Sequence, residues 1–92
     1  MKARPRRSPQ AADVRTVGEI IRAVRRARGE SQRAFAARLG VAQPRVTEWE
    51  TDRVMPAADT LLEVLALAPF GVLYGLVGAY VANRGSAAPD GD

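Results

Sequence analysis

Apolar residues in the first third of the chain recur at helical intervals. Four of them between Val17 and Val24 occupy the i, i+3, i+4 and i+7 positions that define one face of a helix. Thr16 precedes this face and Glu19 lies three residues further on, which is the pattern of a capping box. Gly29 follows the last turn, so the pattern predicts an amphipathic helix between Thr16 and Gly29.

Two short helices are expected next. Ser31 is a candidate N-cap for the first of them, and Gly40 can adopt the left-handed backbone that ends a helix at low cost. The second begins near Gln43, where Pro44 fits the first turn because no intrahelical N–H bond is lost there. The apolar residues expected to face inward from these two helices are Phe35, Ala36, Leu39, Val46 and Trp49.

The second half of the chain predicts two further helices and no strand. A loop over residues 51–56 leads into a helix over residues 58–68, in which leucines and alanines supply the apolar face. Pro69 breaks the chain, and a fifth apolar helix is expected over residues 70–82. The expected fold class is therefore all-α, with five helices in one small domain.

The two ends of the chain are expected to lie outside this domain. Residues 1–13 carry Pro5, Pro9 and several positive charges, so we expect a basic flexible arm. Residues 84–92 also have a composition that is poor in helix formers, and we expect a flexible tail there. The helical domain is thus predicted over residues 14–83.

Charge is distributed unevenly between the two halves of the chain. Residues 1–53 have a net charge of +7, whereas residues 54–92 have a net charge of −3. A basic front half beside an apolar back half is typical of a protein with one surface for a polyanion and another for packing. A coding bias would explain the choice of arginine over lysine, but it would not explain this asymmetry.

The residue inventory leaves little room for catalysis or metal binding. The 92-residue chain has no cysteine and no histidine, which removes thiolate zinc sites, disulfides and every nucleophile pair that needs an imidazole. Its single lysine, Lys2, lies in the expected arm. We therefore expect no enzyme, no metal and no cofactor. The lack of cysteine and of an apolar run behind the charged N-terminus favours a cytoplasmic protein.

The segment QRAFAARLGVAQPRVTEWE, from Gln32 to Glu50, meets the requirements of two helices that cross steeply at a tight turn. Ala36 provides the small residue that is needed where the backbones meet, and Gly40 tolerates a positive φ in the turn. Apolar side chains must also fix the second helix to the core, and the candidates are Phe35, Leu39, Val41, Val46 and Trp49.

On these residues the chain resembles the Cro/C1-type (XRE) helix-turn-helix family, whose members have the lambda-repressor-like fold. The resemblance runs from about Val17 to Leu67, and it includes the Ser-Gln pair at residues 31 and 32 and the Trp-Glu pair at residues 49 and 50. It implies a nucleoid-associated regulator that binds specific double-stranded DNA, with the helix that starts near Gln43 lying in the major groove.

The outward-facing residues of that helix form the expected base-reading set. Gln43 can pair bidentately with adenine, unless it is only a solvated helix start. Arg45 can read guanine or contact only a phosphate, and Glu48 either accepts from cytosine N4 or is tolerated at the edge. Pro44 departs from the polar side chain of the family, so we expect only van der Waals contact there. The full set is Gln43, Pro44, Arg45, Thr47 and Glu48.

The resemblance implies two further groups of residues around this helix. An ion pair between Arg25 and Glu50 would orient the helix without touching DNA. Arg33 and Arg38 either assist the binding of phosphates or form a solvated face. The phosphate-binding set itself lies at helix ends and in the following loop, and it consists of Ser31, Gln32, Thr51 and Arg53.

The expected arm offers either a second DNA contact or an ordinary soluble terminus. The residues that would wrap the duplex or enter its minor groove are Lys2, Arg4, Arg6 and Arg7.

The C-terminal apolar run has two interpretations. Residues 64–82 contain no charge, which meets a length criterion for crossing a membrane. Residues 64–67 belong to the fourth helix, however, and Pro69 interrupts the run, so only residues 70–82 remain. We therefore expect a dimerisation helix and no membrane association. The expected interface consists of Leu73, Tyr74, Leu76, Val77, Tyr80 and Val81.

These expectations favour a transcriptional repressor that binds a palindromic operator as a homodimer and excludes polymerase sterically. The alternative is an antitoxin or antiactivator, which would use the same fold to bind a protein partner through the apolar C-terminal helix.

Overall fold

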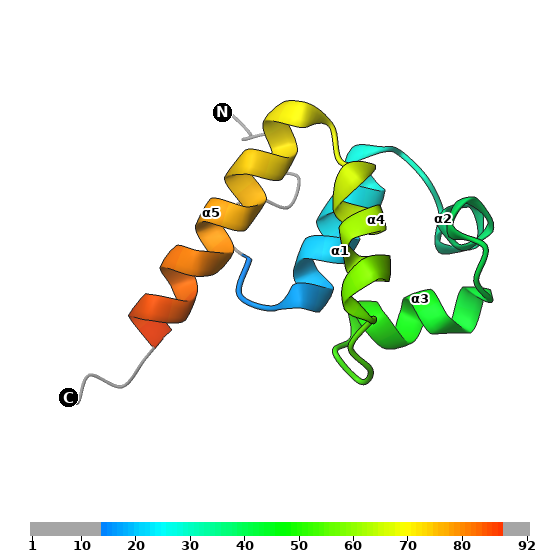
Figure 1. The fold of residues 1–92 in the computed structure, drawn as a ribbon, viewed down its shortest axis with the longest axis horizontal. Helices are drawn as coiled ribbons and strands as arrows, with labels where there is room; N and C mark the ends of the chain where they lie inside the picture. The colour runs from blue at the N-terminus through cyan, green and yellow to red at the C-terminus, as the bar shows by residue number, and fades with distance from the viewer. Residues whose placement is uncertain (1–13, 88–92) are drawn as a thin grey trace, which may run out of the picture.

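The computed structural model describes residues 14–87, and every regular element in this range is a helix (Figure 1). This confirms the expected all-α, five-helix fold. The expected arm over residues 1–13, with Lys2, Arg4, Arg6 and Arg7, lies outside the described residues, as do residues 88–92. The helices are α1 (Val17–Ala27), α2 (Gln32–Leu39), α3 (Gln43–Glu50), α4 (Ala58–Ala66) and α5 (Phe70–Ala87).

The predicted helix ends form by the expected local chemistry. The Thr16 hydroxyl accepts the backbone N–H of Glu19, while the Glu19 carboxylate accepts the N–H of Thr16, which completes the capping box of α1. Ser31 caps α2 in the same way by accepting the N–H of Ala34 at 3.0 Å. Gly40 ends α2 in the left-handed region with φ of 74°, so the chain turns sharply into α3.

The core forms around α1, which packs against α3, α4 and α5. In Figure 1, α1 and α4 lie between α5 on one side and the α2–α3 pair on the other. Phe35 and Val46, which the sequence places on the inner faces of α2 and α3, are fully buried, and Trp49 is 4% exposed. Leu39 and Val41 pack against this cluster while remaining half-buried. The α2–α3 pair is therefore fixed to the rest of the domain by buried side chains of both helices.

The loop after α3 contains a close backbone approach that the sequence patterns do not reveal. Asp52 has a φ of 61°, and its carboxylate accepts the backbone N–H of Gly18 at 2.9 Å. A Cβ atom at residue 18 would collide with the backbone oxygen of Trp49 and with the Asp52 carboxylate. Gly18 thus permits the start of α1 to meet the end of α3, and Asp52 satisfies one of the free donors at the start of α1.

Arginine side chains tie the end of α1 to its neighbours. The Arg28 guanidinium donates to the backbone oxygen of Leu67 at 3.0 Å, which anchors the C-terminal end of α4. Glu30 lies between Arg28 and Arg38 and forms ion pairs with both. These contacts join α1, α2 and α4 on one side of the domain.

The fifth helix is longer than the sequence analysis predicts. We expected α5 to end at residue 82 and residues 84–92 to form a tail, whereas residues 84–87 continue the helix. Two contacts support the extra turns. The Asn83 amide donates to the backbone oxygen of Val14, and the Arg84 guanidinium lies 5.7 Å from the centre of the Tyr80 ring.

The residues that α5 exposes differ from those of the expected dimer interface. Leu76 is 3% exposed within the core of its own chain, so its assignment to a subunit interface is wrong. Leu73 is half-buried, and the half-buried Tyr80 packs against the core. Tyr74, Val77 and Val81 are exposed, and so is Phe70, which was not in the expected set. Within residues 14–87, no helix has the length and apolar character needed to cross a membrane.

Candidate nucleic-acid interface

The predicted base-reading residues lie on the accessible side of α3. Val46 and Trp49 hold the helix from behind, because both side chains are buried in the core. Pro44 and Arg45 are exposed. The remaining members of the set, Gln43, Thr47 and Glu48, are partly exposed. This placement leaves the whole set reachable by a ligand that lies along α3.

Gln32, which was assigned to the phosphate-binding set, also contacts two members of the base-reading set. Its side-chain oxygen accepts from the Gln43 amide at 2.9 Å and from the Thr47 hydroxyl at 2.7 Å. Gln43 also lies within hydrogen-bond distance of the Thr47 hydroxyl, at 3.1 Å. The start of α2 is therefore linked directly to the outer face of α3.

The amide nitrogen of Gln32 contacts the ion pair that the family resemblance implies. The Gln32 amide donates to Glu50 Oε1 at 3.0 Å. Arg25 donates to both carboxylate oxygens of Glu50, at 2.6 and 3.0 Å, and Arg22 lies 3.5 Å from Oε1. The Arg25–Glu50 pair is thus present, and it connects α1 to α3 as expected. We call Arg25, Glu50, Gln32, Gln43 and Thr47 the polar relay.

Glu50 is ionised in this setting despite being 3% exposed. Burial raises the pKa of its carboxyl group, but the hydrogen bonds from Arg25 and Gln32 and the nearby positive charges outweigh burial. The net result is a pKa below the ordinary value of 4.5. The carboxylate therefore acts only as a hydrogen-bond acceptor at neutral pH.

We expect the lowered pKa of Glu50 to make the domain sensitive to acid. The folded-state pKa lies below 4.5, so this group contributes stability that is fully present above 4.5 and is lost as pH falls through the lower folded value. Thermal unfolding followed from pH 7 to pH 3 should show the loss. The loss of stability at low pH should be smaller in Glu50→Gln than in the wild type. Glu63→Gln, on the exposed face of α4, should behave like the wild type. Identical acid profiles for all three proteins would contradict this prediction.

The remaining predicted residues surround α3 without forming one cluster. Arg45 lies 3.7 Å from Glu48, and both side chains are about half exposed, which makes this a loose surface ion pair. The Ser31 hydroxyl is occupied as a cap, and the Thr51 hydroxyl donates to the backbone oxygen of Thr47 at 2.8 Å. Arg53 is exposed. Among the residues that were left undecided, Arg33 is exposed and Arg38 pairs with Glu30.

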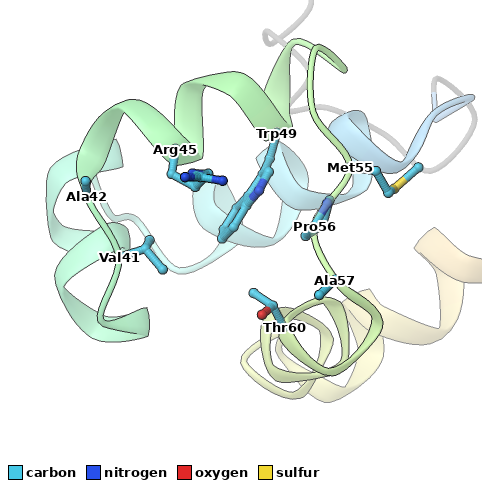
Figure 2. Close-up of a pocket in the computed structure, with 8 residues that line it drawn as sticks. All are labelled: Val41, Ala42, Arg45, Trp49, Met55, Pro56, Ala57 and Thr60. Carbon is cyan, nitrogen blue, oxygen red and sulfur yellow. The ribbon is translucent and has the colours of Figure 1, made fainter.

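A groove of about 390 Å³ separates α3 from the start of α4. Figure 2 shows Arg45 and Trp49 extending from α3 along one wall, with Ala57 and Thr60 on the opposite side. Ala42 and Ala57, the N-cap residues of α3 and α4, also line the groove, and neither side chain caps its helix. Arg45 therefore lies on the side of α3 that faces α4, whereas Gln43 and Thr47 contact α2.

The comparisons with known proteins agree with this geometry. A helix-turn-helix family model matches residues 21–67, a range that contains α2, α3 and α4 entirely and most of α1. Neither the curated proteins nor the solved structures include a significant match to the chain. Because the family match covers just over half of the 92 residues, the chain belongs to the Cro/C1-type helix-turn-helix family of DNA-binding regulators.

Proposed function

We propose that the protein binds a specific double-stranded DNA operator through α3 and represses transcription by excluding polymerase. The observation that carries the proposal is the placement of α3, which Val46 and Trp49 hold from behind while its predicted base-reading side chains stay accessible. A major groove about 12 Å wide admits one such helix. Repression is favoured over activation because α2 contains arginines and no acidic residue, so it offers no acidic face to polymerase.

The direct test is selection of bound duplexes from a random pool at moderate salt. We expect a defined sequence to be enriched, with two inverted half-sites about 34 Å apart. Pro44 should contribute only van der Waals contact, so α3 should specify few base pairs per half-site. Equal binding to every duplex, or none at low salt, would contradict the proposal.

Arg45→Ala should weaken binding to the selected duplex. If Arg45 reads guanine, the loss is roughly 1–3 kcal/mol and is confined to one base step, whereas a phosphate contact would give an equal loss on all sequences. Titration of the selected duplex and of single-base variants, each at two salt concentrations, separates the two cases. Arg26→Ala, which removes an exposed arginine from α1, is the matched control and should bind as the wild type does. Unchanged affinity for Arg45→Ala would remove this residue from the interface.

Two copies of the chain are proposed to associate through the solvent-facing side of α5. The exposed apolar residues of this helix are spaced by four, three and four positions, which places them on one face. Phe70 is 92% exposed and Tyr74 is 85% exposed, values that are high for aromatic side chains in a folded domain. A dimer with a two-fold axis would match a palindromic operator. We call this surface the α5 stripe, and it consists of Phe70, Tyr74, Val77 and Val81.

Tyr74→Glu should convert the dimer to a monomer. A buried unpaired carboxylate in the middle of the α5 stripe would oppose association, while the fold of each subunit should be unaffected because Tyr74 is exposed in the single chain. Sedimentation equilibrium measures the change, and Ala82→Glu, at another exposed position of α5, should remain dimeric. A dimeric Tyr74→Glu protein, or a monomeric wild type, would move the interface elsewhere or remove it.

The α5 stripe also supports the alternative function. An antitoxin or antiactivator would use the same exposed apolar residues to bind a protein partner instead of a second copy. A monomeric wild type that ignores every duplex, yet binds the product of a neighbouring gene through the α5 stripe, would favour this alternative.

A further inference from the structure

The polar relay has a fixed direction because one end of it is a carboxylate. Glu50 is ionised and can only accept hydrogen bonds, so Gln32 must present its NH₂ group to Glu50 Oε1. The opposite end of the same amide, its carbonyl oxygen, then faces Gln43 and Thr47. It follows that the orientation of the Gln32 amide is chemically determined and is not a free choice between two equivalent rotamers.

The orientation of Gln32 determines the orientation of the next amide in turn. The Gln32 oxygen can only accept, so Gln43 must direct its own NH₂ group towards it, at 2.9 Å. The Thr47 hydroxyl donates to the same oxygen at 2.7 Å and closes a triangle with Gln43. Gln43 and Thr47 thus both donate to Gln32, and Gln32 donates to Glu50.

The triangle leaves Gln43 with its carbonyl oxygen as a spare acceptor. Gln32 Oε1 and the Thr47 hydroxyl lie only 2.7 Å apart, so both are on the same side of the Gln43 nitrogen. The NH₂ group of Gln43 is therefore directed towards these two oxygens. Among residues 14–84, the carbonyl oxygen of Gln43 has no hydrogen-bond partner, whereas its nitrogen donates to Gln32 and Thr47.

From this geometry we infer that Glu50 is a positioning residue for base recognition, because its charge fixes, through Gln32, which hydrogen-bonding groups Gln43 presents to DNA. This inference rests on the proposed function, since it concerns how the same site reads a base. A carbonyl oxygen fixed in this way complements the N6 amino group of adenine, which is a donor. The reversed amide would present its NH₂ group outward and would complement the two acceptors of guanine, N7 and O6.

The effect on base preference distinguishes two roles that the Arg25–Glu50 ion pair could have. If Arg25 and Glu50 only support the fold, their loss lowers affinity for all duplexes in parallel. If Glu50 also sets the direction of the relay, its replacement by a neutral amide allows Gln32 and Gln43 to reverse. Discrimination between adenine and guanine is then lost at one position of the operator, while the preferences at other positions remain.

The experiment compares bound-duplex selection for the wild type, Glu50→Gln, Gln32→Leu and the control Glu63→Gln. The base pair that Gln43 reads is first identified as the one at which Gln43→Ala abolishes selection. At that pair the wild type and Glu63→Gln should prefer adenine over guanine by roughly tenfold or more. Glu50→Gln should lose most of that preference and keep the rest of its sequence pattern.

Gln32→Leu makes the test independent of the stability of Glu50→Gln. It cuts the relay without removing either partner of the Arg25–Glu50 pair, and it should lose the same adenine preference at the same position. A base pattern unchanged from the wild type in either folded variant would overturn the inference, as would a Gln43→Ala protein that keeps the full pattern. If the wild type selects no sequence at all, the proposed function itself fails. A specific wild type with unaltered variants overturns only the role of Glu50.

Discussion

Trp49→Ala is expected to unfold the domain or leave it barely folded at room temperature. Trp49 is 4% exposed and belongs to the same buried cluster as Phe35 and Val46. Truncation of a buried aromatic side chain costs about 3–5 kcal/mol, which is a large share of the stability of a domain this small. Because Trp49 also holds α3 against α1, its loss should remove DNA binding together with the fold.

Far-ultraviolet circular dichroism with urea denaturation measures this effect, and a second truncation provides the control. Leu62→Ala removes an apolar side chain of α4 that is 65% exposed, so the free energy of unfolding should change by less than about 0.5 kcal/mol. A Trp49→Ala protein as stable as Leu62→Ala would show that the core of the molecule does not depend on Trp49.

Local patterns are what made the first three helices predictable. The capping box of Thr16 and Glu19, the cap at Ser31 and the left-handed Gly40 act between residues that are close in sequence. These contacts form within one helix end, so they do not depend on how the helices pack against one another. Burial of Val46 at helical spacing from Trp49 follows from the same short-range periodicity.

The contacts that the sequence analysis missed join distant segments. Gly18 and Asp52 are 34 positions apart, and nothing near either residue indicates that α1 must start against the end of α3. The link from Gln32 to Gln43 and Thr47 likewise depends on how steeply α2 crosses α3. The family resemblance supplied the Arg25–Glu50 pair but not the amides that continue from it to the outer face of α3.

The orientation of α5 could not be predicted for a different reason. Its residues are apolar all round from Phe70 to Ala82, so periodicity does not distinguish the inner face from the outer one. Leu76 turns inward and Phe70 outward because the half-buried Val72 and Tyr80 pack on the core together with Leu76. The packing of α5 against α1 and the rest of the core decides which leucine or aromatic side chain is left exposed.

Arg25→Met should be the second most damaging substitution. It leaves the Glu50 carboxylate, which is 3% exposed, without the partner that donates to both of its oxygens. Breaking a buried ion pair by removing one partner costs about 3–5 kcal/mol, because the remaining charge is not compensated. Arg22, at 3.5 Å and 42% exposed, is too distant and too well solvated to replace Arg25 fully. Urea denaturation at pH 7 gives the loss directly.

The double variant Arg25→Met with Glu50→Met then tests whether the pair is needed for folding or for recognition. Replacing a buried ion pair by apolar side chains of similar volume is often neutral, so most of the stability should return. The adenine preference at the base pair that Gln43 reads should not return, because Gln32 has lost the acceptor that fixes its amide. Measuring unfolding and duplex selection on the same protein separates these effects. A stable double variant with the wild-type base preferences would show that the ion pair has no part in recognition. A double variant as unstable as Arg25→Met would show that the domain requires the ion pair itself.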